Sequence, residues 1–168
     1  MMEYQYDVFE NDASKYGIAK YDSNGKWIRV LLSPDYDYIW DLHYLDDKGH
    51  ANVKLGDKCF LIDLEGKKLS ENYDNMKHFE DGVCGVEKNH KWGYINETGA
   101  LIISPKFENG GSFYDGIAIV KFEGKKWLIN KKGEILTEEG YDRILPEDDV
   151  NKKFTVVKDG KEKAIYLH

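Results

Sequence analysis

A phrase of about 34 residues recurs along this chain, and the repetition limits the fold more than any other feature of the sequence. The glycines Gly66, Gly99 and Gly133 lie 33 and 34 residues apart. An aromatic residue followed by an acidic one recurs at spacings of 37, 34 and 34 residues, as Tyr36-Asp37, Tyr73-Asp74, Phe107-Glu108 and Tyr141-Asp142. Because independent markers share one period, we interpret the sequence as a tandem repeat.

The copy between Gly82 and Glu108 indicates what one repeat forms. It alternates short runs of aromatic and β-branched residues with polar turn residues, which is typical of strands on a half-buried sheet. Gly99 can adopt the positive φ that closes a tight turn. Pro105 cannot donate a ladder hydrogen bond, so we place it at a strand end. The predicted strands are Val83–Val86, Trp92–Ile95 and Leu101–Ile103, which make a three-stranded antiparallel meander.

The predicted fold class is therefore all-β, with tandem repeats that are each a three-stranded antiparallel meander. We treat residues 1–168 as a single domain with repeats at roughly 4–50, 51–82, 83–116 and 117–152, and a partial repeat at 153–168. The spacing leaves three arrangements open. The repeats can stack into a solenoid-like array, lie radially as in a propeller, or curl into a barrel.

The most regular repeat resembles a known family, the tryptophan–glycine (WG) repeat proteins. The resemblance rests on Lys91-Trp92-Gly93-Tyr94-Ile95-Asn96, Gly99, Pro105, Phe107-Glu108, Phe113, Asp115-Gly116, Ala118 and Val120. The other repeats depart from the pattern, with Cys59-Phe60 in place of Trp-Gly, Trp127-Leu128 one residue out of step, and Tyr16-Gly17 in the first repeat. The resemblance implies a β-repeat fold. It implies no activity, because these repeats carry no agreed catalytic residues.

The charge of the chain bears on its partners. The net charge is −7, with 31 acidic against 24 basic residues. Nucleic acids and anionic membranes bind basic surfaces, so we expect neither as a partner. A basic protein partner fits this charge, because opposite charge steers association. The alternative is that the charge serves solubility alone.

The apolar runs and the cysteines indicate where the protein is located. The longest apolar runs have four or five residues, which is too short to span a membrane. Met1 to Tyr4 contain neither the basic start nor the apolar segment of a signal peptide, so we expect a cytoplasmic protein. We expect Cys59 and Cys84 to be buried free thiols.

No pattern in the sequence predicts an active site. The histidines form no HExxH motif and no pair at metal-ligand spacing. The segment 109–112 is glycine-rich but lacks the lysine of a phosphate-binding loop, so we interpret it as a connecting loop. We therefore expect no catalytic residue, no metal and no cofactor, and a protein that is not an enzyme.

The first and last repeats contain longer loops than the central ones. From the aromatic residue of the pair to the next strand valine, the interval is 13 residues in the central repeats, 17 in the first and 16 in the last. Insertions in repeat proteins often lie on a binding face, and aromatic residues beside charges are typical interface anchors. The predicted partner-binding residues are Trp40, His43, Tyr44, Asp46 and Asp47 in the first loop and Glu147, Asp148 and Asp149 in the last. The alternative is that both loops only cap the array.

The acidic residues of the recurring pairs allow two interpretations. If the repeats pack in one orientation, Asp37, Asp74, Glu108 and Asp142 form a row of like charges, which a basic ligand would relieve. Alternatively, each of them bonds its own backbone in an Asx-type turn.

Two functions follow as expectations. The first is a non-enzymatic protein-binding module, most concretely a bacterial immunity or antitoxin protein that neutralises a basic toxin domain. The alternative is a carbohydrate- or small-molecule-binding protein, possibly a hydrolase, with a pocket lined by Trp92 or Trp127 and two carboxylates.

Overall fold

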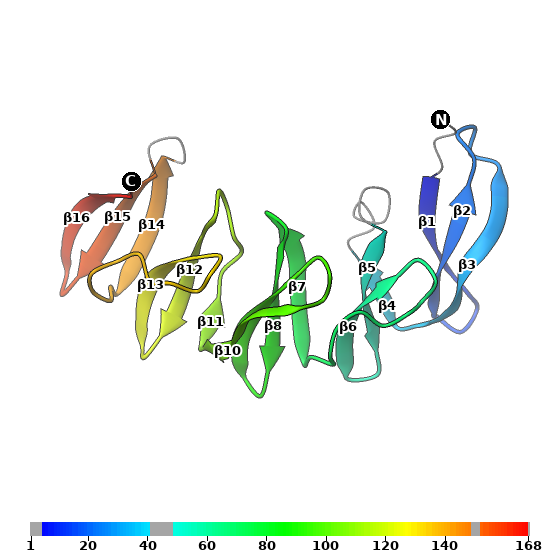
Figure 1. Cartoon of the computed structure of the whole chain (residues 1–168), viewed down its shortest axis with the longest axis horizontal. Helices are drawn as coiled ribbons and strands as arrows, with labels where there is room; N and C mark the ends of the chain where they lie inside the picture. Colours follow the sequence, from blue (N-terminus) through cyan, green and yellow to red (C-terminus); the bar gives the residue numbers. More distant parts are fainter. Residues whose placement is uncertain (1–4, 41–48, 149–151, 168) are drawn as a thin grey trace. The chain divides into compact units, whose positions relative to one another are not determined.

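The computed structural model describes residues 5–40, 49–148 and 152–167, and within these ranges the chain forms strands and turns without a helix (Figure 1). The chain divides into two compact units. The first contains the residues up to His78 together with the turn 96–100, and the second contains residues 79–95 and 101–168. Strand β7 (Asn75–Glu80) carries the chain from the first unit into the second.

Two three-stranded antiparallel sheets form the first unit. Their strands, in spatial order, are β1 (Gln5–Glu10), β2 (Tyr16–Tyr21) and β3 (Trp27–Tyr36), and then β4 (Tyr38–Trp40), β5 (His50–Leu55) and β6 (Lys58–Asp63). The two sheets share one core, because Ile18 of β2 and Val53 of β5 belong to the same buried cluster. Each sheet thus buries its apolar face against its neighbour.

The second unit continues the same pattern. Its strands are β8 (Val83–Lys88), β9 (Lys91–Asn96) and β10 (Leu101–Phe107), then β11 (Asn109–Gly110), β12 (Ile117–Phe122) and β13 (Lys125–Asn130), then β14 (Arg143–Asp148), β15 (Lys153–Lys158) and β16 (Lys161–Tyr166). One core cluster joins Tyr94 of β9 to Val120 of β12, and a second contains Leu128 of β13 and Val156 of β15. The all-β fold of repeated antiparallel meanders is therefore confirmed, whereas the boundaries of the repeats stay a prediction.

One turn follows the second strand of the hairpin in successive repeats and sets where the next segment starts. At Asn96 the side-chain Oδ1 accepts hydrogen bonds from the N–H groups of Thr98 and Ala100, both at 3.0 Å. The Gly99 N–H donates to the Asn96 carbonyl at 2.9 Å, and Gly99 has a φ of +81°. The same bonds are made at Asp22, Asp63 and Asn130. The predicted role of the turn glycine is confirmed.

The glycine of the Trp-Gly pair controls how closely the third strand approaches the second. A Cβ atom on Gly93 would lie 2.4 Å from the Ile103 carbonyl oxygen and 2.6 Å from the Pro105 nitrogen. Because Gly93 has no side chain, β10 can pair directly with β9. Gly17 makes the same close approach to the Leu32 carbonyl oxygen, at 2.5 Å.

Large residues occupy this position in the other two repeats, and the third strand is lost there. Phe60 and Trp127 lie three residues before the turn, as Gly93 does. Beside them, isolated bridges replace a continuous strand, at Lys68 and Tyr73 and at Ile135 and Tyr141. Residues 134–137 accordingly form no strand, and the Trp127 ring lies directly against Gly140.

Some boundaries also differ from the predicted ones. β10 continues through Pro105 to Phe107, where we expected a strand end. It can do so because β10 is an outer strand and its register shifts between Ile103 and Phe107, so the missing N–H of Pro105 leaves no ladder bond unmade. Trp40, Glu147 and Asp148, which we expected in the terminal loops, lie in the strands β4 and β14.

We expect Gly93→Ala to lower the free energy of unfolding by about 2 kcal/mol, because the new methyl group must displace the backbone of β10. The measurement is urea unfolding followed by tryptophan fluorescence. Gly124→Ala is the control. Gly124 has a φ of +76° with open space around it, so an alanine there costs only the strain of the left-handed backbone conformation, about 1 kcal/mol. A Gly93→Ala protein as stable as the Gly124→Ala protein would contradict the close-approach argument.

Candidate functional site

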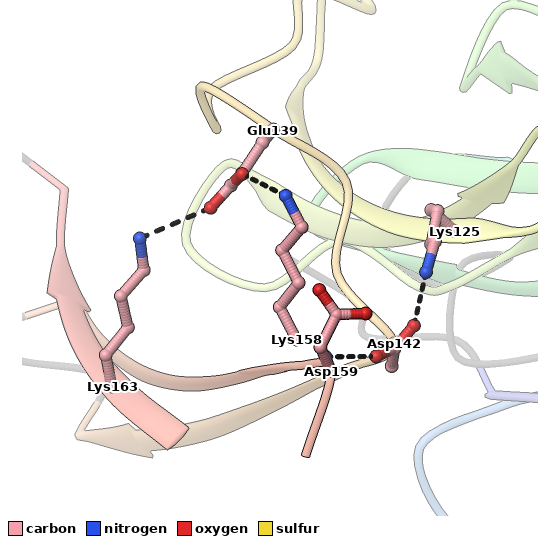
Figure 2. Close-up of polar contacts among 6 residues, drawn as sticks. All are labelled: Lys125, Glu139, Asp142, Lys158, Asp159 and Lys163. Carbon is pink, nitrogen blue, oxygen red and sulfur yellow. Dashed lines mark hydrogen bonds and ion pairs between the residues drawn. The ribbon is translucent and has the colours of Figure 1, made fainter. Parts of the chain in front are cut away.

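In three of the four recurring pairs the acidic residue binds the turn of the following hairpin. The Asp37 carboxylate accepts hydrogen bonds from the Gly56 N–H at 2.6 Å and from Lys15 Nζ at 2.5 Å. Figure 2 shows the same arrangement at Asp142, which accepts from the Asp159 N–H at 2.9 Å and from Lys125 Nζ at 2.5 Å.

The other two pairs follow this scheme with small differences. Glu108 accepts from the Gly124 N–H at 2.9 Å and lies 3.4 Å from Lys121 Nζ. Asp74 forms an ion pair with Lys58 at 2.8 Å. We call the four residues Asp37, Asp74, Glu108 and Asp142 the acidic anchors. They are neither an unrelieved row of like charges nor residues that bond their own backbone, because they bond groups 13 to 22 residues away.

These contacts keep the anchors ionised. The Lys15 hydrogen bond and then the Gly56 N–H lower the pKa of Asp37, and the Lys125 bond and then the Asp159 N–H lower the pKa of Asp142. At Glu108 the Gly124 N–H has the largest effect in lowering the pKa. The carboxylates therefore hold their charge at neutral pH but already have cationic partners within the fold.

The first unit contains a hollow of about 820 Å³ beside β4, which we call the first-unit hollow. It is lined by Asp37, Tyr38, Trp40, Lys54, Gly56, Cys59, Asp74, Asn75, Met76 and His78. Two carboxylates, one lysine and two aromatic side chains thus face a single space. Of the residues predicted to bind a partner, Trp40 is the one that the structure places here.

Contacts on both sides hold the aromatic pair in the hollow. The Trp40 indole Nε1–H donates to the Lys77 carbonyl at 3.5 Å, and Asn52 Nδ2 donates to the same carbonyl at 3.1 Å. The Tyr38 ring lies 5.8 Å from the Trp40 ring and 5.9 Å from the Tyr16 ring. Tyr38 is 54% exposed. We did not predict Tyr38 as a site residue, although its place two residues before Trp40 on one strand is a sequence signal for a shared face.

The remaining predicted partner-binding residues lie elsewhere. Five of them lie outside the described residues, namely His43, Tyr44, Asp46, Asp47 and Asp149. Glu147 belongs to β14 of the second unit, where it pairs with Lys153 Nζ at 2.6 Å and accepts a hydrogen bond from Thr155 Oγ1. Asp148 is the last residue of that strand. Glu147 is thus engaged by its own sheet, and the binding role of these residues stays a prediction.

The structure gives no evidence for thiol or metal chemistry in the described ranges. Cys59 and Cys84 are buried thiols that are not in a disulfide, as predicted. Burial raises the pKa of the Cys59 thiol, which keeps it protonated although it lines the first-unit hollow. No group of three or more potential metal ligands occurs among residues 5–40, 49–148 and 152–167.

Trp92 and Trp127, which we expected to line a ligand pocket, pack against the core of the second unit. The Trp127 Nε1–H donates to the Phe122 carbonyl at 3.1 Å. A separate apolar cavity of about 410 Å³ lies in the second unit, between Tyr114, Ile119, Pro146 and Phe154. The aromatic residues that line this cavity are therefore Tyr114 and Phe154, not the two tryptophans.

Comparison with known proteins agrees with the repeat geometry. The family described as "WG containing repeat" matches residues 60–92 and 92–127. Residues 60–127 of the chain contain WG repeats. The two matched copies include Gly93 and the acidic anchors Asp74 and Glu108, so the resemblance that we drew from the sequence is confirmed. No curated protein sequence matches the chain.

Some solved structures are similar to the WG-repeat chain. Hsv2 of Kluyveromyces lactis, with loop 6CD replaced by a Gly-Ser linker, is 12% identical over 98% of this chain and 62% of that chain, with a TM-score of 0.47. The WD40 domain of SCAP from fission yeast is 13% identical over 100% of this chain and 56% of that chain, with a TM-score of 0.32. The chain thus spans about three fifths of the length of these proteins, and their functions do not carry over to it.

The described part of the WG-repeat chain contains no helix that is long and apolar enough to cross a membrane.

We expect the Asp142→Asn protein to lose less stability in acid than the unmodified chain. The folded-state pKa of Asp142 lies below the unfolded value of about 4, so its contribution is present above that pH and is lost as the pH falls through the folded value. The measurement is the urea midpoint between pH 7 and pH 2. Asp7→Asn is the control, since Asp7 is exposed on β1. Equal acid sensitivity of the Asp142→Asn and unmodified proteins would show that the anchor bonds do not contribute to stability.

Proposed function

We propose that this WG-repeat chain is a non-enzymatic protein-binding module, and that the first-unit hollow receives a basic segment of its partner. The observation that carries the proposal is the pair of neighbouring aromatic rings, Tyr38 and Trp40, in a hollow of about 820 Å³ that is also lined by two carboxylates. Aromatic anchors beside charged groups are the residues that dominate binding energy at protein interfaces.

The chemistry of the hollow suits an arginine or lysine side chain. A guanidinium group stacks on the face of a tryptophan or tyrosine ring and donates in parallel to a carboxylate. The lining offers both kinds of group, with Asp37 and Asp74 outnumbering Lys54. Trp40 is already held by the Lys77 carbonyl, so binding costs little side-chain ordering there.

The more specific form of the proposal is a bacterial immunity or antitoxin protein that acts in the cytoplasm and neutralises a basic toxin domain. The net charge of −7 supports a basic partner, because it accelerates encounter with a positively charged protein. The aromatic and acidic lining of the first-unit hollow supports the same class of partner.

A second candidate function is the binding of a small molecule. The apolar cavity of about 410 Å³ in the second unit favours it, with Tyr114 65% exposed at its edge. This cavity lacks the tryptophans that we expected for a carbohydrate site, so an apolar ligand fits it better than a sugar.

We expect the tagged chain to co-purify from its native cells, at low ionic strength, with a basic protein in a stoichiometric complex. The association rate should fall about tenfold or more as salt rises from low to molar concentration, because the steering charges become screened. The measurement is surface plasmon resonance with the purified partner over a salt series. An association rate that does not change with salt would contradict the steering argument.

We expect Tyr38→Ala and Trp40→Ala each to weaken this complex by about 30-fold, the effect of losing an interface hot spot. Trp27→Ala is the matched control, since Trp27 is 57% exposed on β3 and does not line the hollow. Equal affinities of all three variants for the partner would exclude the first-unit hollow as the binding site. Co-purification without any protein, together with binding in a small-molecule screen that Tyr114→Ala abolishes, would favour the second candidate function.

A further inference from the structure

The carboxylates that line the first-unit hollow already have cationic partners, whereas one lysine of the lining has no anionic partner. Asp37 holds Lys15 at 2.5 Å, and Asp74 holds Lys58 at 2.8 Å. Lys54 also lines the hollow, and it forms no ion pair among the residues that the structure describes. The two carboxylates and the lysines that they hold cancel, so Lys54 contributes a positive charge that these pairs do not balance.

The register of the second sheet places Lys54 beside the aromatic rings of the hollow. Lys54 lies opposite Tyr38 in the pairing of β4 with β5, and opposite Cys59 in the pairing of β5 with β6. Residues that lie opposite each other on antiparallel strands present their side chains on the same face of the sheet. The Lys54 side chain is exposed, so its ammonium group is accessible to a ligand in the hollow.

An arginine that enters the hollow meets like charges there. Its guanidinium group can share the two carboxylates with Lys15 and Lys58, because a carboxylate offers about four acceptor positions. It nevertheless adds a cation beside these two lysines and Lys54, and like charges repel. Asp57, a second partner of Lys58, has a side chain that is 86% exposed and does not line the hollow. An acidic group on the same ligand, paired with Lys54, would relieve this repulsion.

The strand register also sets the spacing between the two ligand groups. Trp40 lies opposite Asn52, which is two residues before Lys54 on β5. Such diagonal neighbours on an antiparallel pair are about 7 Å apart. In an extended segment, residues two positions apart point to the same side and are also about 7 Å apart. An acidic residue two positions from an arginine therefore reaches Lys54 while the arginine lies on Trp40.

We propose that the first-unit hollow recognises an extended partner segment in which an arginine and an aspartate or glutamate are two positions apart, and that Lys54 selects the acidic residue. This inference rests on the proposed protein-binding function and specifies the chemistry of the partner. The guanidinium group stacks on the aromatic rings and shares the carboxylates of the hollow. The acidic side chain accepts a hydrogen bond from Lys54 Nζ.

The test uses fluorophore-labelled synthetic peptides. The peptide GGEGRGEGG carries an acidic residue two positions from the arginine on each side, so it serves both chain directions, and GGQGRGQGG is its neutral counterpart. We expect the unmodified chain to bind GGEGRGEGG about threefold more tightly, the effect of one exposed ion pair. The measurement is fluorescence anisotropy at about 0.15 M salt, where the long-range field of the net charge of −7 is screened.

Variants of Lys54 assign this preference to one residue. Lys54→Gln should bind both peptides equally, and Lys54→Glu should instead prefer GGKGRGKGG, because the sign of the selecting charge is reversed. Lys67→Gln is the matched control and should keep the threefold preference, since Lys67 is an exposed lysine of the same unit that does not line the hollow. Circular dichroism checks that all three variants keep the fold.

The outcomes separate this inference from the proposed function. Equal affinities of the unmodified chain for GGEGRGEGG and GGQGRGQGG, or an unchanged preference in Lys54→Gln, would overturn the role of Lys54 and leave the basic partner in place. Equal binding of GGEGQGEGG and GGEGRGEGG would overturn the arginine, and with it the basic segment of the proposed function. Absence of binding to every peptide would overturn this inference, whereas co-purification decides the proposed function.

Discussion

The bond from an acidic anchor to the next hairpin is the interaction on which the repeat depends. Neighbouring side chains on an extended segment point to opposite sides, so an aromatic–acidic pair can serve two surfaces at once. Tyr73, Phe107 and Tyr141 are almost fully buried between sheets. The following carboxylate remains at the surface and bonds a lysine, with an added turn N–H at Asp37, Glu108 and Asp142. One dipeptide therefore supplies both apolar burial and a directional bond.

The parts of the fold that depend on local contacts could be predicted from the sequence. The turn at Asn96 closes within five residues, so its asparagine and Gly99 reveal it directly. The predicted strands Val83–Val86 and Trp92–Ile95 lie within β8 and β9, because aromatic and β-branched residues lie there between clear turn signals. The period of the repeat was equally visible.

The contacts that join distant segments could not be predicted in this way. The partner of Asp37 is a turn N–H 19 residues on, and nothing in the spacing of the acidic residues shows it. The loss of the strand beside Trp127 depends on a close backbone approach that Gly93 permits and a tryptophan prevents. The first-unit hollow likewise unites Trp40 of β4 with His78 of β7, a neighbourhood set by strand order. The predicted pair of binding loops gave only Trp40 of this site.

The internal pairing of the anchors changes how the charge of the chain relates to binding. A net charge of −7 describes the long-range field, but the repeated carboxylates already hold lysines, so a basic ligand must share these carboxylates with them. Specific binding then depends most on the groups that the repeat does not use internally. Tyr38 lies in a strand next to an anchor without belonging to the repeated pair, and it lines the first-unit hollow together with Trp40. Departures from the repeat, more than its consensus residues, are thus where a partner can be recognised.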